Sequence, residues 1–292
     1  MLAGGKELSD IPIWPADPAD VAPPGADILH RSGDSRTGSP RRSPSSVPQN
    51  YDKQDAEFIA FKREHPDATF AQYQMGLMAR KIGDGSSHPT LGANLVDAAG
   101  NKLDFWTAGA AKAKSLIRSG EVTPDRRVIE YGCGSLRIAA HFIKYLEPEK
   151  FYGADVVDGF YEIGKTLIGE ALLREKRPRF DVISDATVEN LARFSADFIY
   201  SSSVCYHVHP DEIAFYFAAL EKITAKPGAI LMFDVKLTDK PTRYLSHSWA
   251  WPLEFIKNAL PGLEFVEAIK PREIDRGGHM VSFSVLKFCR PS

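Results

Sequence analysis

The chain has 292 residues, of which 43% are hydrophobic and 25% are charged, and its formal net charge is −2. This composition is typical of a folded, soluble protein, and the small charge gives no general attraction to nucleic acid or anionic lipid. No apolar run reaches the roughly 20 residues that a membrane-spanning helix needs. Cys133, Cys205 and Cys289 are widely spaced, which favours reduced thiols and a cytoplasmic location over a disulfide framework.

The sequence divides into three predicted parts. Residues 1–50 are rich in Pro, Gly and Ser and poor in large apolar residues, so we expect a disordered tail. Residues 51–122 are predicted to form a helical cap, because apolar residues recur every three or four positions over 55–66, 68–83 and 103–120. The last two of these helices are separated by a predicted loop over 84–101. Residues 123–292 form the third part.

This third part alternates predicted strands with predicted helices. The strands are 126–132, 150–157, 179–185, 196–203 and 228–235, and the helices are 135–146, 158–176 and 210–224. Near-continuous apolar strands separated by helices predict a parallel sheet covered on both faces. The last two strands, 263–270 and 279–288, are joined by a short loop and predict a hairpin. We therefore predict an α/β fold: a Rossmann-like, doubly wound, seven-stranded sheet with an antiparallel last strand and an N-terminal helical cap.

A glycine-containing loop follows the first predicted strand. Gly132 and Gly134 let the backbone turn sharply and approach a ligand closely, beside the start of the next helix. In doubly wound sheets, ligands bind beyond the carboxyl ends of the strands. Asp155 ends the second predicted strand, at a spacing that suits a carboxylate binding ribose hydroxyls. Asp185 ends the third and, with the N–H of Ala186, is placed to contact an adenine edge.

These residues resemble the class I S-adenosylmethionine-dependent methyltransferases. The family's first motif, acidic-x-Gly-x-Gly, matches Glu130 to Gly134, and the run GCGSLR resembles a subset of bacterial small-molecule methyltransferases. Leu136 departs from the pattern, since many members have a third glycine there. The resemblance implies S-adenosylmethionine as cofactor, with Asp155 binding ribose, Asp185 reading adenine and Glu130 near the methionine portion. The implied cofactor site comprises Glu130, Gly132, Cys133, Gly134, Arg137, Asp155, Val156, Asp185, Ala186 and Ser202.

Arg137 is the unusual residue of this loop. It is predicted to lie in the first turn of a helix, where a guanidinium opposes the helix dipole and needs an anionic partner. That partner is either the methionine carboxylate of the cofactor or a protein carboxylate such as Glu130. Arg137 also stands where a dinucleotide-binding GxGxxG loop has its third glycine, which argues against a nicotinamide enzyme.

The predicted chemistry requires mainly that an acceptor be positioned against the methyl group. A general base is needed only when the acceptor loses a proton, and His207 and Asp234 are the candidates. For His207, packing under the helix or a hydrogen bond to a loop carbonyl is favoured over the role of a base. His209 precedes Pro210 and is expected to be solvated. No further His or Cys cluster completes a tetrahedral set with these histidines, so no metal site is predicted.

Aromatic residues are candidates for the acceptor pocket. Trp106, Tyr206 and Trp249 are predicted to line it, although aromatic residues at such junctions also build cores. Lys112 from the cap and Tyr244 and His247 from the segment before the hairpin are further candidates. In the hairpin loop Arg272, Arg276 and His279 would suit an anionic acceptor or simply face solvent.

The sequence therefore predicts an S-adenosylmethionine-dependent methyltransferase. Its acceptor is expected to be a small molecule, with oxygen favoured and a metabolite or glycan precursor as the substrate class. Neither nucleic acid nor membrane is an expected partner. The alternatives are a catalytically silent cofactor-binding or scaffold protein and, less favoured, a protein methyltransferase or an NAD-dependent oxidoreductase. The sequence leaves the oligomeric state open.

Overall fold

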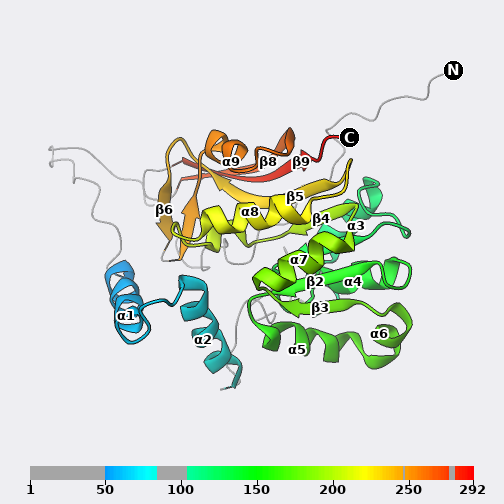
Figure 1. Ribbon diagram of the computed structural model, residues 1–292, viewed down its shortest axis with the longest axis horizontal. Coiled ribbons are helices and arrows are strands. Elements are labelled where there is room, and N and C mark those ends of the chain that lie inside the picture. The colour runs from blue at the N-terminus through cyan, green and yellow to red at the C-terminus, as the bar shows by residue number, and fades with distance from the viewer. Residues whose placement is uncertain (1–49, 84–103, 246, 276–279) are drawn as a thin grey trace, which may run out of the picture.

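The computed structural model describes residues 50–83, 104–245, 247–275 and 280–292 (Figure 1). Residues 1–49 of the predicted tail, the predicted loop 84–101, Arg276 and His279 lie outside the described residues. Within the described ranges, no helix has the length and apolar character that crossing a membrane requires.

A seven-stranded sheet with the order β3-β2-β1-β4-β5-β9-β8 organises the molecule (Figure 1). Strands β1 to β5 run parallel, and β9 is antiparallel to both β5 and β8. The chain order reverses between β1 and β4, which is where doubly wound sheets bind ligands. The predicted fold class is therefore confirmed. The strands are β1 (Val128–Tyr131), β2 (Phe151–Asp155), β3 (Arg179–Val182), β4 (Phe198–Ser201), β5 (Ile230–Leu237), β8 (Glu264–Asp275) and β9 (Met280–Cys289).

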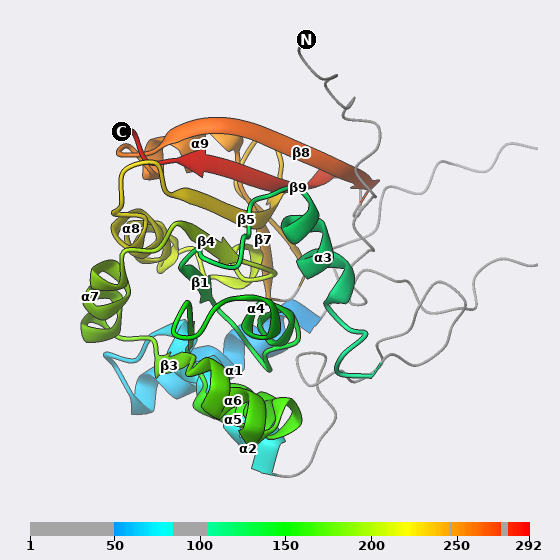
Figure 2. The same cartoon turned by 90° about the vertical axis from the view of Figure 1, so that its right-hand side faces the viewer.

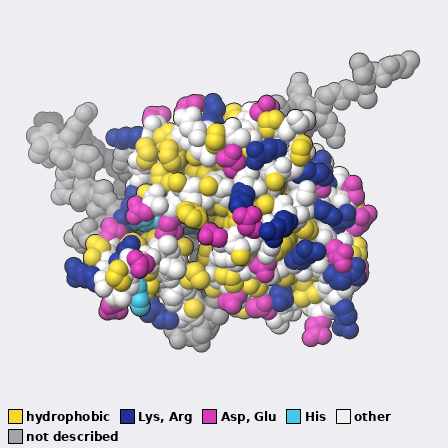
Figure 3. Space-filling model, viewed as in Figure 1, with side chains coloured by type: hydrophobic (Ala, Val, Ile, Leu, Met, Phe, Trp, Pro, Cys, Tyr) yellow, Lys and Arg dark blue, Asp and Glu magenta, His cyan; other side chains and the backbone are white. Residues whose placement is uncertain are grey.

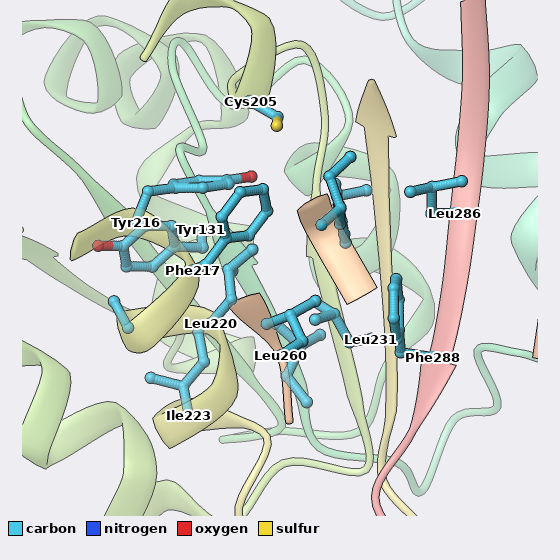
Figure 4. Packing of buried hydrophobic residues seen from close by; sticks show 14 of the residues in the cluster. Tyr131, Cys205, Tyr216, Phe217, Leu220, Ile223, Leu231, Leu260, Leu286 and Phe288 are labelled. Atoms are coloured by element: carbon cyan, nitrogen blue, oxygen red, sulfur yellow. The ribbon is translucent and has the colours of Figure 1, made fainter. Parts of the chain in front are cut away.

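Helices cover both faces of this sheet (Figure 2). One face packs against α3 (Ala110–Arg118), α4 (Ala139–Tyr145), α5 (Asp158–Ile168) and α6 (Glu170–Lys176). The other packs against α7 (Asp185–Phe194), α8 (Ile213–Ile223) and α9 (Leu253–Ala259). Figure 4 shows part of this second face, where Phe217 and Leu220 of α8 meet Leu231 of β5. Charged side chains of both signs are interspersed on the surface in Figure 3.

The N-terminal helices α1 (Asn50–Glu64) and α2 (Phe70–Gly83) pack beside the α8 face. Thr69 and Gln72 form a reciprocal capping box, with backbone-to-side-chain distances of 2.8 and 3.1 Å, which fixes the start of α2. The carboxylate of Glu212 also accepts from the N–H groups of Phe70 and Ala71. The cap helices are therefore held to the loop before α8, whereas α3 packs on α4 at the opposite face. The division of the chain into three parts stays a prediction.

Several predicted boundaries were wrong for reasons of backbone geometry. The helix expected from residue 135 begins at Ala139, because Leu136 has a φ of 64° that no α-helix contains. The single helix expected over 158–176 is broken at Gly169, whose φ is 89°. The helix expected over 103–120 is limited to α3, because Asp104 and Thr107 hydrogen-bond in a separate turn.

Two α-helices, α7 and α9, and two short strands were not predicted. Helix α7 begins at Asp185, and Ser184 caps it by accepting from the N–H of Thr187 at 3.1 Å. A small antiparallel pair, β6 (Thr242–Leu245) and β7 (Ser248–Ala250), precedes α9. These strands are short, and their position is set by tertiary contact: the N–H of Trp251 donates to the carbonyl oxygen of Lys236 at 2.9 Å.

Candidate functional site

The loop after β1 folds back over the end of β2. Gly132 and Gly134 have φ values of 83° and 50°, in the left-handed region that favours glycine. The N–H groups of Gly132 and Cys133 donate to the carbonyl oxygen of Ala154 at 2.7 and 3.0 Å. A Cβ atom at Gly132 would lie 2.3 Å from the side chain of Val204, so a larger residue would not fit. The loop is thus built for close backbone approach.

Leu136 takes the conformation that a third glycine would favour. Its φ is 64° and its side chain is fully buried beneath α5. A left-handed conformation costs an L-residue about 1–2 kcal/mol, whereas burying a leucine stabilises by roughly 1.5–3 kcal/mol. A Cβ at Gly164 of α5 would lie 2.8 Å from the Leu136 side chain, which shows how closely the helix covers the loop. Burial therefore explains this departure from the glycine pattern.

Asp155 ends β2 directly beside the loop. Its carboxylate accepts from the N–H of Gly134 at 2.7 Å and from the N–H of Val157 at 3.1 Å, and the residue is only 7% exposed. Burial raises the pKa of this carboxyl group, although the two N–H donors act in the opposite direction. A carboxylate has about four acceptor positions, so each oxygen can accept a further hydrogen bond.

Glu130 lies on the next strand of the same sheet and is almost completely buried. Its exposed fraction is 2%, and burial raises its pKa to about 8, against the opposing positive charge of Lys112. Its Oε2 atom has no hydrogen-bond partner in the described part of the chain. Buried polar atoms are normally paired, so this oxygen is a candidate acceptor for a donor on a ligand.

Lys112 of α3 and Asp234 of β5 form a buried ion pair. The Nζ atom of Lys112 is 2.7 Å from Oδ2 of Asp234, and the same oxygen accepts from the Ser202 hydroxyl at 3.0 Å and the Ser203 N–H at 3.2 Å. Asp234 is fully buried, and its Oδ1 atom has no partner among the described residues. The strand predicted over 228–235 is β5, which begins at Ile230 and continues to Leu237, so Asp234 lies within the strand. The oxygen nearest Lys112 is therefore already paired, which weakens the case for Asp234 as a base.

Arg137 lies in the turn before α4 and not in the first helical turn as predicted. It is half-buried, and its positive charge acts to lower the pKa of Glu130. Glu130 is thus within its electrostatic reach, which is one of the two alternatives left open by the sequence. The contact of Arg137 with a cofactor carboxylate stays a prediction.

The predicted adenine-reading residues lie near the carboxyl end of β3. Strand β3 ends at Val182, and Asp185 is the exposed first residue of α7, where it was expected to end the strand. Ala186 follows it and is also exposed, whereas Val156, after Asp155, is half-buried. The roles of Asp185, Ala186 and Val156 in binding an adenosine stay predictions.

His207 lies in a short 3₁₀ turn, Cys205–His207, that follows β4. Its Nδ1 atom is 2.9 Å from the carbonyl oxygen of His247 and 3.3 Å from the Ser248 hydroxyl. His207 is exposed, so the side chain can reach solvent or a substrate while β7 holds one ring nitrogen. This geometry is compatible with both a base and a loop-binding role.

The three predicted pocket aromatics have different surroundings. Trp106 packs edge-on against His141 of α4, at 5.9 Å between ring centroids. Tyr206 lies 4.5 Å from the His207 ring. Trp249 is 5.3 Å from the ring of His209, among rings of the cap. That these three residues line one pocket stays a prediction.

His209 corrects another expectation. It was expected to be solvated, but its ring lies 4.8 Å from Phe70 and 5.7 Å from Phe58, in the interface between the cap and the sheet domain. Burial lowers the pKa of this histidine. Among the described residues, no group of three or more His, Cys, Asp or Glu side chains is placed to hold a metal ion.

Lys236 is a charged residue that the sequence reasoning missed. It lies on β5, two residues after Asp234, and is only 2% exposed. Its ammonium nitrogen lies 4.1 Å from the centre of the Phe283 ring and 4.9 Å from that of Tyr206. The available signal was the run FDVKL, in which two charged residues alternate with apolar ones at the end of a buried strand.

Comparison with known proteins adds structural similarity only. No family model matches the chain, and no curated protein matches it. Magnesium protoporphyrin IX methyltransferase from Synechocystis PCC 6803, solved with bound SAH, is 13% identical over 73% of this chain and 94% of its own, with a TM-score of 0.47.

Two further solved structures give similar values. The YcgJ protein from Bacillus subtilis is 12% identical over 63% of this chain and 99% of its own, with a TM-score of 0.46. A SAM-dependent methyltransferase from Methanosarcina mazei is 15% identical over 60% of this chain and 97% of its own, with a TM-score of 0.43. At such low identities and TM-scores, any conclusion about function depends on the residues of the chain itself.

Proposed function

We propose that this protein binds S-adenosylmethionine and transfers its methyl group to a small molecule. The observation that carries the proposal is the pairing of Asp155 with the Gly132–Gly134 turn at the point where the sheet order reverses. A buried carboxylate that also retains acceptor capacity suits the two ribose hydroxyls of an adenosine. The short, tightly covered loop leaves no phosphate cradle of the dinucleotide type.

The buried charges next to this loop suit the amino-acid end of the same ligand. Within the described ranges, Oε2 of Glu130 and Oδ1 of Asp234 have no partner and could accept from an ammonium group, and Lys112 and Arg137 supply positive charge for a carboxylate. Such a combination of both signs in a dry site fits a zwitterion better than a single ion. The donor and acceptor set therefore fits S-adenosylmethionine.

Once bound, this cofactor would supply a methyl group on a sulfonium: an acceptor nucleophile would form a bond to the methyl carbon as the C–S bond breaks in line with it, and the electron pair would stay on sulfur. The protein's part is then to hold the acceptor in line and to exclude water. The 3₁₀ turn with Tyr206 and His207, together with the end of β5, forms the neighbouring part of the same sheet edge. We place the acceptor there and favour oxygen as the methylated atom, with a metabolite or glycan precursor as substrate.

Calorimetric titration with S-adenosylhomocysteine tests cofactor binding. We expect Asp155→Ala to weaken binding at least tenfold, because about 1.4 kcal/mol of ribose contact corresponds to that factor. Glu162→Ala removes an exposed carboxylate of α5 and should leave the affinity unchanged. An unchanged affinity in Asp155→Ala would contradict the proposed site. Transfer of label from labelled S-adenosylmethionine to a metabolite extract separates an enzyme from a silent cofactor-binding scaffold.

A further inference from the structure

Glu130 lies near the carboxyl end of β1, two residues before Gly132, and its carboxyl group is withdrawn from water. The residue is 2% exposed, and its Oε2 atom has no hydrogen-bond partner in the described part of the chain. Buried polar atoms normally have a partner, because desolvation without a compensating hydrogen bond is unfavourable. The charge state of Glu130 therefore depends on what surrounds it.

Two other buried carboxyl groups lie near Glu130, and both have donors. Asp155 of β2 accepts from two backbone N–H groups, at 2.7 and 3.1 Å. Oδ2 of Asp234 in β5 is 2.7 Å from the Nζ atom of Lys112 and accepts from the Ser202 hydroxyl at 3.0 Å. Such donors favour the ionised form of a carboxyl group, and Oε2 of Glu130 lacks them among the described residues.

The proton of this cluster is therefore expected on Glu130. Ionising Glu130 would bury a negative charge beside two other carboxyl groups, which costs more than leaving a neutral O–H group without a partner. The electrostatics agree with this geometry. Burial raises the pKa of Glu130 to about 8, and the carboxyl groups of Asp155 and Asp234 act in the same direction.

The cations and other titratable groups around Glu130 do not reverse this balance. Lys112 of α3 and Arg137 of the turn before α4 lower the pKa of Glu130, but neither is a hydrogen-bond partner of Oε2. The sheet register places Tyr200 of β4 next to Glu130, and Cys133 follows in the glycine loop. Burial raises the pKa of both groups, so both are neutral near pH 7.

This cluster is not closed to ligands at the carboxyl end of the sheet. Ser202, which donates to Asp234, is half-buried, and so is Arg137. The side chain of Lys112 is partly exposed. The amino-acid end of a ligand that lies along the glycine loop would meet the cluster from this side.

We propose that Glu130 carries a proton in the free protein and that the ammonium group of S-adenosylmethionine replaces this proton. This inference rests on the proposed function. The ammonium donates to Oε2, Glu130 becomes a carboxylate, and the proton leaves to solvent. One positive charge is exchanged for another, so the net charge of the buried site does not change. The exchange gives Oε2 the donor that the described part of the chain does not provide.

The exchange makes cofactor binding depend on pH in one direction. Below about pH 8 the free protein holds the proton and must release it to bind, so acidification weakens binding by about tenfold for each pH unit. Above about pH 8 Glu130 is already ionised, and the dependence levels off. A ligand without an ammonium group cannot replace the proton, so its binding should not follow this pattern.

Calorimetric titration of the full chain with S-adenosylhomocysteine, which has the same amino-acid end, counts the released proton. Titrations at about pH 6.5 in phosphate and in imidazole differ in heat, because the two buffers bind a proton with different enthalpies. We expect about one proton released for each ligand bound, and an affinity roughly tenfold higher at about pH 7 than at about pH 6. Methylthioadenosine, which has the adenosine but no amino-acid end, should release no proton.

Two matched variants identify the source of the proton. In Glu130→Gln the side chain keeps nearly the same shape and does not titrate, so binding should release no proton and should vary little with pH. Glu162→Gln makes the same chemical change in α5, where the side chain is 56% exposed, and should keep the wild-type proton release. If Glu130→Gln fails to fold, the comparison of the two ligands on the wild-type chain still decides the proposal.

The outcomes separate this inference from the proposed function. Binding of S-adenosylhomocysteine without proton release would overturn the exchange and leave the proposed cofactor site standing. Proton release that persists in Glu130→Gln, or that also accompanies methylthioadenosine, would overturn the exchange as well, because another group would then be its source. No binding of S-adenosylhomocysteine from about pH 6 to pH 8 would contradict the proposed function, and the exchange with it.

Discussion

The two faces of the central sheet carry very different side chains. On the α3 and α4 face, the described strands β1, β2 and β5 present Glu130, Asp155, Asp234 and Lys236, each less than a tenth exposed. On the α8 face, the alternate positions of the same strands present no carboxylate or amine, and residues such as Ile129, Leu231 and Phe233 build the larger core.

This difference indicates which face has a role beyond folding. Burying a charge costs far more than burying an aliphatic group, so a fold selected only for stability would make both faces alike. All four ionisable residues lie toward the carboxyl ends of their strands, where a ligand is expected. The α8 face provides rigidity, and the opposite face carries the candidate chemistry.

The largest expected effect comes from breaking the buried ion pair. Lys112→Met leaves the fully buried carboxylate of Asp234 without its cation, and should lower the free energy of unfolding by about 3–5 kcal/mol. Lys165→Met removes a pair with Glu162 whose side chains are 33% and 56% exposed, and should cost less than about 1 kcal/mol. Denaturant unfolding of both variants gives the comparison. Equal losses would show that the charged face is no more sensitive than the surface.

A second test uses the pH dependence of stability. Glu130 has its pKa raised from 4.5 to about 8 in the folded protein, so between these values the folded state holds a proton that the unfolded state has lost. Its contribution to stability is therefore complete below about pH 4.5 and is lost as the pH rises to about 8. The expected slope is about 1 kcal/mol for each pH unit.

Glu130→Gln isolates this contribution, because glutamine has nearly the same shape and does not titrate. The difference in unfolding free energy between wild type and Glu130→Gln should grow between pH 5 and about 8 and level off above it. Thermal and denaturant unfolding across this range provide the measurement. A difference that does not vary over this pH range would mean that Glu130 is ionised in the folded as well as the unfolded state. The raised pKa of Glu130 would then be contradicted.

The sequence was a good guide to the charged face where the chemistry follows simple spacing. The mainly parallel sheet, the glycine turn and the place of Asp155 at the end of β2 could be predicted, because parallel strands end at one edge of the sheet. Lys112 was named as a candidate, but its pairing with Asp234 joins residues 122 positions apart and depends on how α3 packs on the sheet.

The burial of Lys236 and the conformation of Leu136 were not predicted, because they too depend on contacts between distant elements. The burial of Lys236 depends on Phe283 and Tyr244, which reach it through the β5–β9 register and the small β6–β7 pair. The left-handed conformation of Leu136 depends on α5 covering it. Neither arrangement leaves a local pattern, because each is set by packing between elements that are distant in the sequence.

The smallest expected effect concerns the contact that shapes the glycine loop. A Cβ at Gly164 would lie 2.4 Å from the carbonyl oxygen of Ser135, so Gly164→Ala should push α5 away from the loop and cost about 1–3 kcal/mol. Gly76 of α2 has open space around its Cβ position, and Gly76→Ala should stabilise by up to about 1 kcal/mol through helix propensity. The two variants should therefore shift the midpoint of thermal unfolding in opposite directions.

Because Gly134 donates to Asp155 from this loop, Gly164→Ala should also weaken S-adenosylhomocysteine binding, while Gly76→Ala leaves it unchanged. Weaker folding with unaltered affinity in Gly164→Ala would mean that the loop acts on stability alone.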